Sequence, residues 1–226
     1  MDIFRQHEVF EIEVLDKMKS AKVLEALVFG GGSMLRLCHE LNRYSVDLDF
    51  WFVKRMSHAT YFNKLQNIFE KEYEITDAHT KRHTLLLELR SPDYPKRLKV
   101  EIRREMKEWD VQEKIAFSRY STKQVILKAH TMEQTMSNKI EAFLDRGEIR
   151  DGFDIEFLLR RGVTLPDMDD TQADAFKKKL ARFKERDFKV KLGSTLESDI
   201  RSYYIAHKFN YLEETLASAL KKRDSH

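Results

Sequence analysis

Apolar side chains in the first part of the chain follow a helical spacing and then a strand-like run. Between residues 8 and 26 they recur every three or four positions, which predicts an amphipathic helix. A short apolar run at 27–29 ends at three consecutive glycines, and Ser33 then stands as the expected N-cap of a helix that continues to residue 41. This order predicts a strand, a glycine turn and a helix.

The segment 45–53 alternates strictly between apolar and polar side chains. Its apolar positions share one face, and Asp47 and Asp49 share the other. We therefore expect a half-buried strand whose open face carries two carboxylates. A helix over 58–71 and three strands over 72–79, 83–90 and 96–104 are expected to follow, and the chain should turn helical after the apolar run 125–127.

The remainder of the chain is expected to be helical. Apolar residues recur at helical spacing over four segments, namely 133–147, 150–161, 168–187 and 196–222. The pattern predicts an α/β (α+β) fold class, with an α/β domain in residues 1–130 and a helical domain in residues 131–226. No segment rich in Pro, Gly or Ser marks a linker between the two.

Composition narrows the class of protein. The 226 residues include 42% hydrophobic and 35% charged side chains with only 7 Gly and 3 Pro, which disfavours disordered, collagen-like and loop-rich β proteins. The single cysteine, Cys38, excludes an intramolecular disulfide and a cysteine-based zinc finger. No apolar run approaches the ~18 residues of a membrane helix, and the N-terminus has no apolar segment typical of a signal peptide. We therefore expect a soluble, cytoplasmic protein without a membrane partner.

Two motifs suit phosphate groups and divalent metal ions. Gly31-Gly32-Ser33 opens the second expected helix, where free backbone N–H groups favour a phosphate, and the alternative is a tight connection without a ligand. Asp47 and Asp49 project from one strand face about 6.6 Å apart along the backbone. That spacing suits one shared Mg²⁺ or two bridged ions, and the alternative is a solvent-exposed strand face.

Glu101 is the only acid near the centre of the strand expected over 96–104, and it points away from the apolar face. If this strand lies beside the one that carries Asp47 and Asp49, three carboxylates converge. The alternative for Glu101 is a salt bridge to a basic neighbour on its own strand.

Basic residues form two groups in the helical part of the chain. Lys139, Arg146 and Arg150 are seven and four residues apart, so a continuous helix would align them and let Lys139 reach a triphosphate. The alternative is that Asp151 caps the next helix and pairs with an arginine. The second group lies within residues 177–191, and from it we single out Lys177, Lys178, Arg182 and Lys184. It is a local excess of positive charge in a chain whose net charge is only +3. Such an excess suits binding to RNA phosphates, and the alternative is a solvated helix face.

Three motifs between about residues 30 and 160 occur in a distinctive order. They are Gly31-Gly32-Ser33, then Arg43-x-Ser-x-Asp47-Leu-Asp49-Phe with the later Lys99-x-Glu101, and finally Lys139 followed by Arg146, Arg150-Asp151 and Asp154. Together they resemble the AbiEii/AbiGii toxin-like family of the polymerase-β-like nucleotidyltransferase superfamily. The resemblance implies a mixed sheet flanked by helices, followed by a helical region.

The resemblance also implies a role for each matched residue. Asp47 and Asp49 would be the metal-binding pair, and Glu101 would bind the second metal and help to deprotonate the attacking hydroxyl. The expected nucleotide-binding residues are Gly31, Gly32 and Ser33, which would hold the phosphates, together with Arg43, Lys139 as a clamp on the triphosphate, and Asp151 near it.

The implied reaction is attack of an acceptor hydroxyl on the α-phosphorus of an NTP, with release of pyrophosphate and two Mg²⁺ (or Mn²⁺) ions as cofactors. The acceptor is expected to be RNA, specifically the 3′ end of tRNA. Two alternatives stay open: transfer to a protein hydroxyl, and a non-catalytic module that binds nucleic acid or a partner. The resemblance further implies toxicity that a separate antitoxin protein neutralises.

Overall fold

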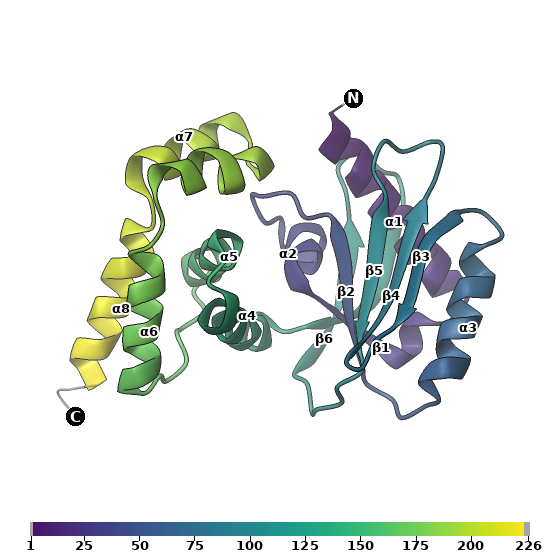
Figure 1. The fold of residues 1–226 in the computed structure, drawn as a ribbon, viewed down its shortest axis with the longest axis horizontal. Helices are drawn as coiled ribbons and strands as arrows, with labels where there is room; N and C mark the ends of the chain where they lie inside the picture. The colour runs from purple at the N-terminus through teal and green to yellow at the C-terminus, as the bar shows by residue number, and fades with distance from the viewer. Residues whose placement is uncertain (1, 224–226) are drawn as a thin grey trace. The chain divides into compact units, whose positions relative to one another are not determined.

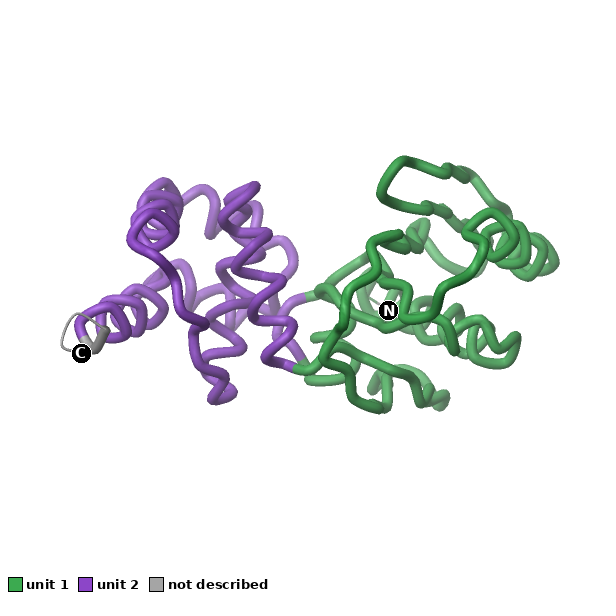
Figure 2. The backbone as a smooth tube through the Cα atoms, turned by 90° about the horizontal axis from the view of Figure 1, so that it is seen from below, with its two compact units in different colours: residues 1–40, 44–131 green, residues 41–43, 132–226 purple. Residues whose placement is uncertain are grey.

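The computed structural model describes residues 2–223 and divides them into two units (Figure 2). Unit 1 contains the residues up to Glu40 together with Tyr44–Thr131, and unit 2 contains Leu41–Arg43 together with the residues from Met132 onward. The short segment Leu41–Arg43 therefore belongs with the C-terminal helices, although unit 1 flanks it on both sides in the sequence.

Unit 1 is built on a seven-stranded mixed sheet in the order β3-β4-β5-β2-β1-β7-β6 (Figure 1). The β1–β7 and β2–β5 pairs are parallel, and the other neighbouring strands are antiparallel. The strands are β1 (Leu27–Gly30), β2 (Asp47–Phe52), β3 (Glu74–Thr80), β4 (Thr84–Arg90), β5 (Leu98–Arg103), β6 (Val111–Phe117) and β7 (Gln124–His130).

Three helices accompany this sheet, namely α1 (Ile3–Ser20), α2 (Gly31–His39) and α3 (His58–Phe69), with a short 3₁₀ turn at Leu24–Ala26 (Figure 1). The apolar side of β2 is fully buried because Leu48, Phe50 and Phe52 all point into the core. The ring of Phe52 packs edge-on against Tyr61 of α3 at 5.1 Å. The strict alternation of β2 thus places its apolar side chains in the core and its acids on the opposite face.

Unit 2 is helical and has an aromatic core. Phe143 packs on Phe176 with ring centroids 4.6 Å apart, and Phe188 packs on Phe209 at 5.1 Å. Its helices are α4 (Met132–Arg146), α5 (Ile149–Arg160), α6 (Asp170–Leu180), α7 (Ser198–His207) and α8 (Asn210–Arg223), with a π-helical turn at Asp187–Leu192 and a 3₁₀ turn at Gly193–Thr195. None of the helices in residues 2–223 has the length and apolar character to cross a membrane.

Several expected boundaries differ from those observed. Ser33 is not the N-cap of α2, because the helix begins at Gly31 with Gly30 as its cap. The hairpin β6–β7 was not expected beyond the run 125–127. In β6 the apolar positions do not mark a buried face, since Val111 and Ile115 are exposed. The spacing of apolar residues therefore gives only a weak indication of this hairpin.

The two longest helices expected in unit 2 are each interrupted. The helix expected over 168–187 ends at Leu180, and the Asp187 side chain accepts a hydrogen bond from the Lys184 amide, which starts a new turn. The helix expected over 196–222 breaks at Lys208, whose φ is 50°. This reversal lets Phe209, only 1% exposed, enter the aromatic core.

Candidate active site

Two adjacent parallel strands carry the three candidate metal-binding acids. Strand β2 pairs with β5 in a register that places Asp49 opposite Glu101 and Asp47 opposite Lys99. Neighbouring strands lie ~4.8 Å apart and side chains directly opposite one another project from the same face. The three carboxylates therefore gather on one face of the sheet, which we call the acid face (Asp47, Asp49 and Glu101).

The acid face is neither fully buried nor fully exposed. All three carboxylate residues are half-buried, whereas Lys99 and Arg103 on the same face of β5 are exposed. Like charges directly opposite each other on neighbouring strands destabilise a sheet. The Asp49–Glu101 juxtaposition is therefore costly for the fold, and a bound cation would offset that cost.

Gly31 lies against the acid face and cannot be replaced without strain. Its φ of 72° is in the left-handed region that favours glycine, and a Cβ at this position would lie 2.9 Å from Cβ of Asp49. The first residue of α2 therefore brings backbone into direct contact with one of the acids. This close approach and the turn explain why residue 31 is a glycine.

The acid face supplies the donors that a hard divalent cation prefers. Carboxylate oxygens suit Mg²⁺ and Mn²⁺, and the register of β2 and β5 brings three of them to one place. Within residues 2–223, no three His, Cys, Asp or Glu side chains are already arranged around a common metal position. The residues thus fit a divalent metal by chemistry and register, while their side chains do not form a closed ligand cluster.

Ser33 does not present its side chain to solvent. The residue is fully buried, and its Oγ lies 2.8 Å from Oε1 of Glu11 and 2.6 Å from the main-chain oxygen of Asp47. The expectation that this hydroxyl holds a nucleotide phosphate is not supported by its orientation. In this motif, the backbone N–H groups of Gly31 and Gly32 at the start of α2 remain available as hydrogen-bond donors to a phosphate.

Arg43 takes part in a buried ion-pair network of unit 2. Its guanidinium makes two hydrogen bonds to Asp154, with Nε at 2.7 Å from Oδ1 and the second nitrogen at 2.6 Å from Oδ2. The Lys139 ammonium lies 2.7 Å from Asp154 Oδ2 and 3.3 Å from Asp151 Oδ1. Burial alone would raise the pKa of Asp154, but the Arg43 and Lys139 cations hold it below its usual value. Asp154 is therefore an ionised acid fully enclosed by protein.

The remaining basic residues of this region do not lie on one continuous helix. Helix α4 ends at Arg146 and α5 begins at Ile149, with Gly147 between them at a φ of 65°. Arg146 makes two hydrogen bonds to Asp151, at 2.7 and 2.8 Å. The structure therefore contains the pairing of Asp151 with an arginine that the sequence offered as an alternative. Arg150 pairs with Glu148 instead. The helices expected over 133–147 and 150–161 are therefore separate, and the three cations do not form the single row that a continuous helix would give.

The chain matches the family model of the "Nucleotidyl transferase AbiEii toxin, Type IV TA system" over residues 14–222. This chain belongs to the AbiEii nucleotidyltransferase toxin family. It is a nucleotidyltransferase, and the family is the toxin component of type IV toxin–antitoxin systems, which implies a nucleotide substrate and an antitoxin partner. Nucleotidyltransferases generally use divalent metal ions, in keeping with the donors on the acid face.

Two solved structures share the fold of this AbiEii-family chain. JHP933 from Helicobacter pylori is 19% identical, with a TM-score of 0.54, and the match covers 95% of this chain and 97% of the other. A second H. pylori structure, of a protein assigned as a nucleotidyltransferase, is 20% identical, with a TM-score of 0.57 and coverage of 93% and 97%. No curated protein matches the chain at a significant level. At these identities, the two structures support the mixed-sheet fold alone.

The basic segment of this AbiEii-family protein lies on the surface of unit 2. Residues 177–191 contain eight Lys or Arg and two acidic residues, whereas the whole chain carries a net charge of only +3. The four residues singled out there, Lys177, Lys178, Arg182 and Lys184, are all exposed. Their exposure leaves these four side chains accessible for the expected contact with RNA phosphates.

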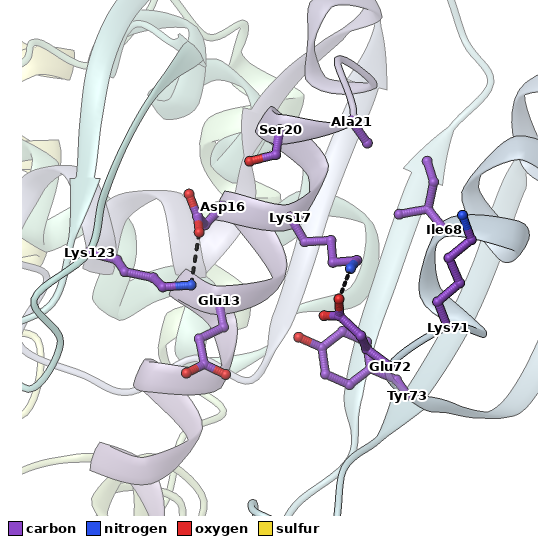
Figure 3. A pocket seen from close by; sticks show the side chains of 10 residues that line it. All are labelled: Glu13, Asp16, Lys17, Ser20, Ala21, Ile68, Lys71, Glu72, Tyr73 and Lys123. Carbon is purple, nitrogen blue, oxygen red and sulfur yellow. Dashed lines mark hydrogen bonds and ion pairs between the residues drawn. The ribbon is translucent and has the colours of Figure 1, made fainter.

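A cavity of about 510 Å³ lies elsewhere in unit 1, between α1 and the residues around the end of α3 (Figure 3). Four of its charged side chains form two ion pairs, Lys17 with Glu72 and Lys123 with Asp16 at 2.9 Å. None of the three acids of the acid face lines this cavity. We therefore assign it no part in nucleotide transfer.

Glu11 is a buried acid of unit 1 that the sequence motifs did not point to. It is 1% exposed on α1 and lies beside Ser33. A signal was present in the helical spacing, since positions 7, 11, 15 and 18 fall on one face and the last two are the core residues Leu15 and Met18. An acid on the apolar face of a helix indicates a specific hydrogen-bond partner in the interior.

Proposed function

We propose that this protein transfers a nucleoside monophosphate from an NTP to an acceptor hydroxyl, with the acid face as its metal-binding and catalytic centre. The observation that carries the proposal is the register of β2 and β5, which sets Asp49 directly opposite Glu101 with Asp47 on the same face. Acids arranged in this way weaken the fold unless they are neutralised, and a nucleotide-bound divalent metal would neutralise them.

In the proposed reaction, the acceptor oxygen forms a bond to the α-phosphorus and the bond from that phosphorus to the pyrophosphate oxygen breaks. Asp47, Asp49 and Glu101 would hold two Mg²⁺ or Mn²⁺ ions, which would neutralise the charge that develops on the phosphate oxygens. The carboxylate of Glu101 would accept the proton of the attacking hydroxyl. The longer side chain of glutamate reaches further from β5 than aspartate would, which suits a base that must meet an external acceptor.

Phosphate binding would fall to backbone groups at the start of α2. The N-terminal turn of a helix offers unpaired N–H groups and a partial positive charge. Gly31 is the first residue of the helix, and its backbone approaches Asp49 closely. We assign the terminal phosphates of the NTP to Gly31 and Gly32.

Arg43, Lys139 and Asp151 support the proposed nucleotide site less directly. The resemblance alone suggests a contact with the nucleotide, whereas each of the three makes buried ion pairs within unit 2. A triphosphate would have to compete with Asp151 and Asp154 for the Lys139 ammonium. We therefore assign these residues first to the stability of unit 2.

RNA is the acceptor that the charge distribution favours, and the 3′ end of tRNA is the specific acceptor that we propose. The support is the excess of cations in residues 177–191, which are exposed at Lys177, Lys178, Arg182 and Lys184. Phosphate backbones bind such clusters without sequence preference. A protein acceptor remains an outcome that the same experiment can reveal.

The test is a transfer assay with Mg²⁺, each of the four labelled NTPs and total tRNA. Wild-type protein should label RNA, and Asp49→Asn should not. Asp93→Asn is the matched control, because Asp93 is an exposed aspartate in the turn before β5. Label in a protein band would replace the RNA acceptor by a protein, and no transfer from any NTP would contradict the proposed function.

A growth experiment addresses the toxin. Expression of the wild-type protein alone should slow bacterial growth, and expression of Asp49→Asn should not. Equal growth with both proteins, at equal amounts of folded protein, would contradict toxicity by nucleotide transfer.

A further inference from the structure

Two consecutive carbonyl groups at the entrance to β2 accept hydrogen bonds from buried side chains. The Nε2 atom of His7 lies 3.0 Å from the oxygen of Val46, and Oγ of Ser33 lies 2.6 Å from the oxygen of Asp47. His7 is 1% exposed and Ser33 is fully buried. Because a carbonyl oxygen only accepts, the histidine must carry its proton on Nε2 and the serine must donate to Asp47.

The donor count at Ser33 determines what Glu11 must be. A serine hydroxyl has a single hydrogen, yet Ser33 Oγ lies within hydrogen-bond distance of both Asp47 O and Glu11 Oε1, the latter at 2.8 Å. If the hydrogen goes to Asp47, the second contact needs a hydrogen from Glu11. Glu11 is then a neutral carboxylic acid that donates to Ser33, and Ser33 in turn donates to Asp47.

The surroundings of Glu11 favour this neutral form. Burial raises the pKa of Glu11 well above its usual value, and this effect outweighs the hydrogen bond with Ser33, which lowers it. The Arg36 guanidinium is engaged by Glu8 at 2.9 Å. The hydrogen-bond geometry at Ser33 and the burial of Glu11 therefore agree.

Position along β2 decides which face its acids occupy. A shift of one residue in a strand moves every side chain to the opposite face. Val46 precedes the first residue of β2, and Asp47 is that first residue. Helix α2 contacts the strand twice, through the Gly31 backbone at Asp49 and through the Ser33 hydroxyl at Asp47.

We propose that His7, Glu11 and Ser33 form a positioning group, the β2 anchor, that holds the main chain of Val46 and Asp47 so that Asp47 and Asp49 face Glu101. In this role Ser33 acts on the backbone of β2 and does not bind the nucleotide. The inference rests on the proposed function for its catalytic consequence, whereas the hydrogen-bond chain itself can be tested in the absence of any substrate.

The first test compares Ser33→Ala with wild type in two measurements. The melting temperature of the nucleotide-free protein should fall by about 2–6 °C, because a buried carbonyl and a buried carboxyl lose their partner. In the transfer assay kcat should fall on the order of tenfold, with the KM for the NTP within about twofold of wild type, because a misplaced acid slows the reaction. A raised KM together with an unchanged melting temperature would overturn the proposal and return Ser33 to the phosphate site.

The second test uses Glu11→Gln and Glu11→Ala. The glutamine side chain keeps a donor for Ser33 Oγ, so Glu11→Gln should retain wild-type kcat and a melting temperature at least equal to wild type. Glu11→Ala should resemble Ser33→Ala, and the double variant should lose less than the sum of the two single losses. Equal losses in the glutamine and alanine variants would overturn the hydrogen-bond chain.

Ser118→Ala is the matched control for both tests. Ser118 is also a buried serine of unit 1, and its hydroxyl accepts from the Tyr120 amide in the turn after β6. It should lower the melting temperature without changing kcat. If wild-type protein shows no transfer at all, the proposed function fails, and the melting temperatures and the double-variant comparison still decide whether the anchor exists.

Discussion

Aspartates of the two units lie in opposite electrostatic surroundings. In unit 1, Asp49 sits opposite another acid, Glu101, on the neighbouring strand. In unit 2, Asp154 is enclosed by two cations, Arg43 and Lys139, at 2.6 and 2.7 Å. The second arrangement stabilises the folded unit once it is formed, whereas the first weakens the sheet. An acid that lies opposite another acid is the one suited to an external metal ion and substrate.

The sharpest way to break this comparison is to remove the charge of Asp49. Asp49→Asn should lower nucleotide transfer by at least ~100-fold, because the site loses one of the carboxylates that would hold the metal ions at the reacting phosphate. The melting temperature should stay the same or rise, since the repulsion with Glu101 is relieved. Transfer assays and thermal denaturation measure the two effects, with Asp93→Asn as the control. A marked loss of stability in Asp49→Asn would show that the acid face supports the fold.

The same chemical change in unit 2 should have the opposite result. Asp154→Asn removes the carboxylate that both buried cations, Arg43 and Lys139, contact, which should cost about 3–5 kcal/mol of unfolding free energy. Urea denaturation followed by circular dichroism would measure it. Asp145→Asn, at an exposed position of α4, is the control and should have little effect. Wild-type stability in Asp154→Asn would contradict the structural role of the network.

Glu11 is a third kind of acid, and its pH dependence sharpens the comparison. Burial raises the pKa of Glu11 in the folded state above the usual 4.5. The wild-type protein is therefore most stable below the pKa that Glu11 has in the unfolded chain. Its free energy of unfolding falls as the pH rises from that value to the higher pKa of the folded state. Glu11→Gln cannot ionise and escapes this loss. It should match wild type near pH 4 and exceed it by about 1.4 kcal/mol for each pH unit above that range, until the folded pKa is reached.

Unfolding free energies of wild type and Glu11→Gln, measured at several pH values, provide the readout. Glu25→Gln is a suitable control, because Glu25 is exposed. A variant that is less stable than wild type at pH 7 and equal at pH 4 would show that Glu11 is ionised in the folded protein. That result would contradict the neutral acid at this position.

Exposed cations of unit 2 should behave differently from the buried ones. The double variant Lys177→Ala, Lys178→Ala should keep wild-type stability and bind tRNA more weakly. The slope of log affinity against log salt should fall in magnitude by about 1.4, if each lysine contacts one phosphate. Filter binding at several salt concentrations measures the slope. Lys64→Ala with Lys71→Ala removes two exposed lysines from unit 1 and should leave it unchanged.

Much of the fold near the acid face could be predicted from local pattern. The alternation at 45–53 predicts both the strand β2 and the face that carries Asp47 and Asp49, and the glycine run predicts the turn from β1 to α2. These features depend on side chains a few residues apart, so periodicity is sufficient to reveal them. The hairpin β6–β7 was missed because its apolar side chains are partly exposed.

Contacts between residues far apart in the sequence could not be predicted from the spacing of apolar and polar side chains. Ser33 reaches Glu11 across 22 positions, and Arg43 reaches Asp154 across 111. The motif containing Ser33 suggested a phosphate ligand, but packing of α2 against α1 turned its hydroxyl toward the interior. Likewise, Gly147 separates α4 from α5, so Lys139, Arg146 and Arg150 do not share one continuous helix.

The amino-acid order alone determined the family motifs, the order of strands and helices around them, and the side of β2 on which its acids lie. Folding in three dimensions decided which strand became the neighbour of β2, which acids met cations and which met another acid, and where the Ser33 hydroxyl points. The reason is physical. Periodicity is set by the geometry of a single strand or helix, whereas the charge and hydrogen-bond partners of a side chain are set by whatever packing brings beside it.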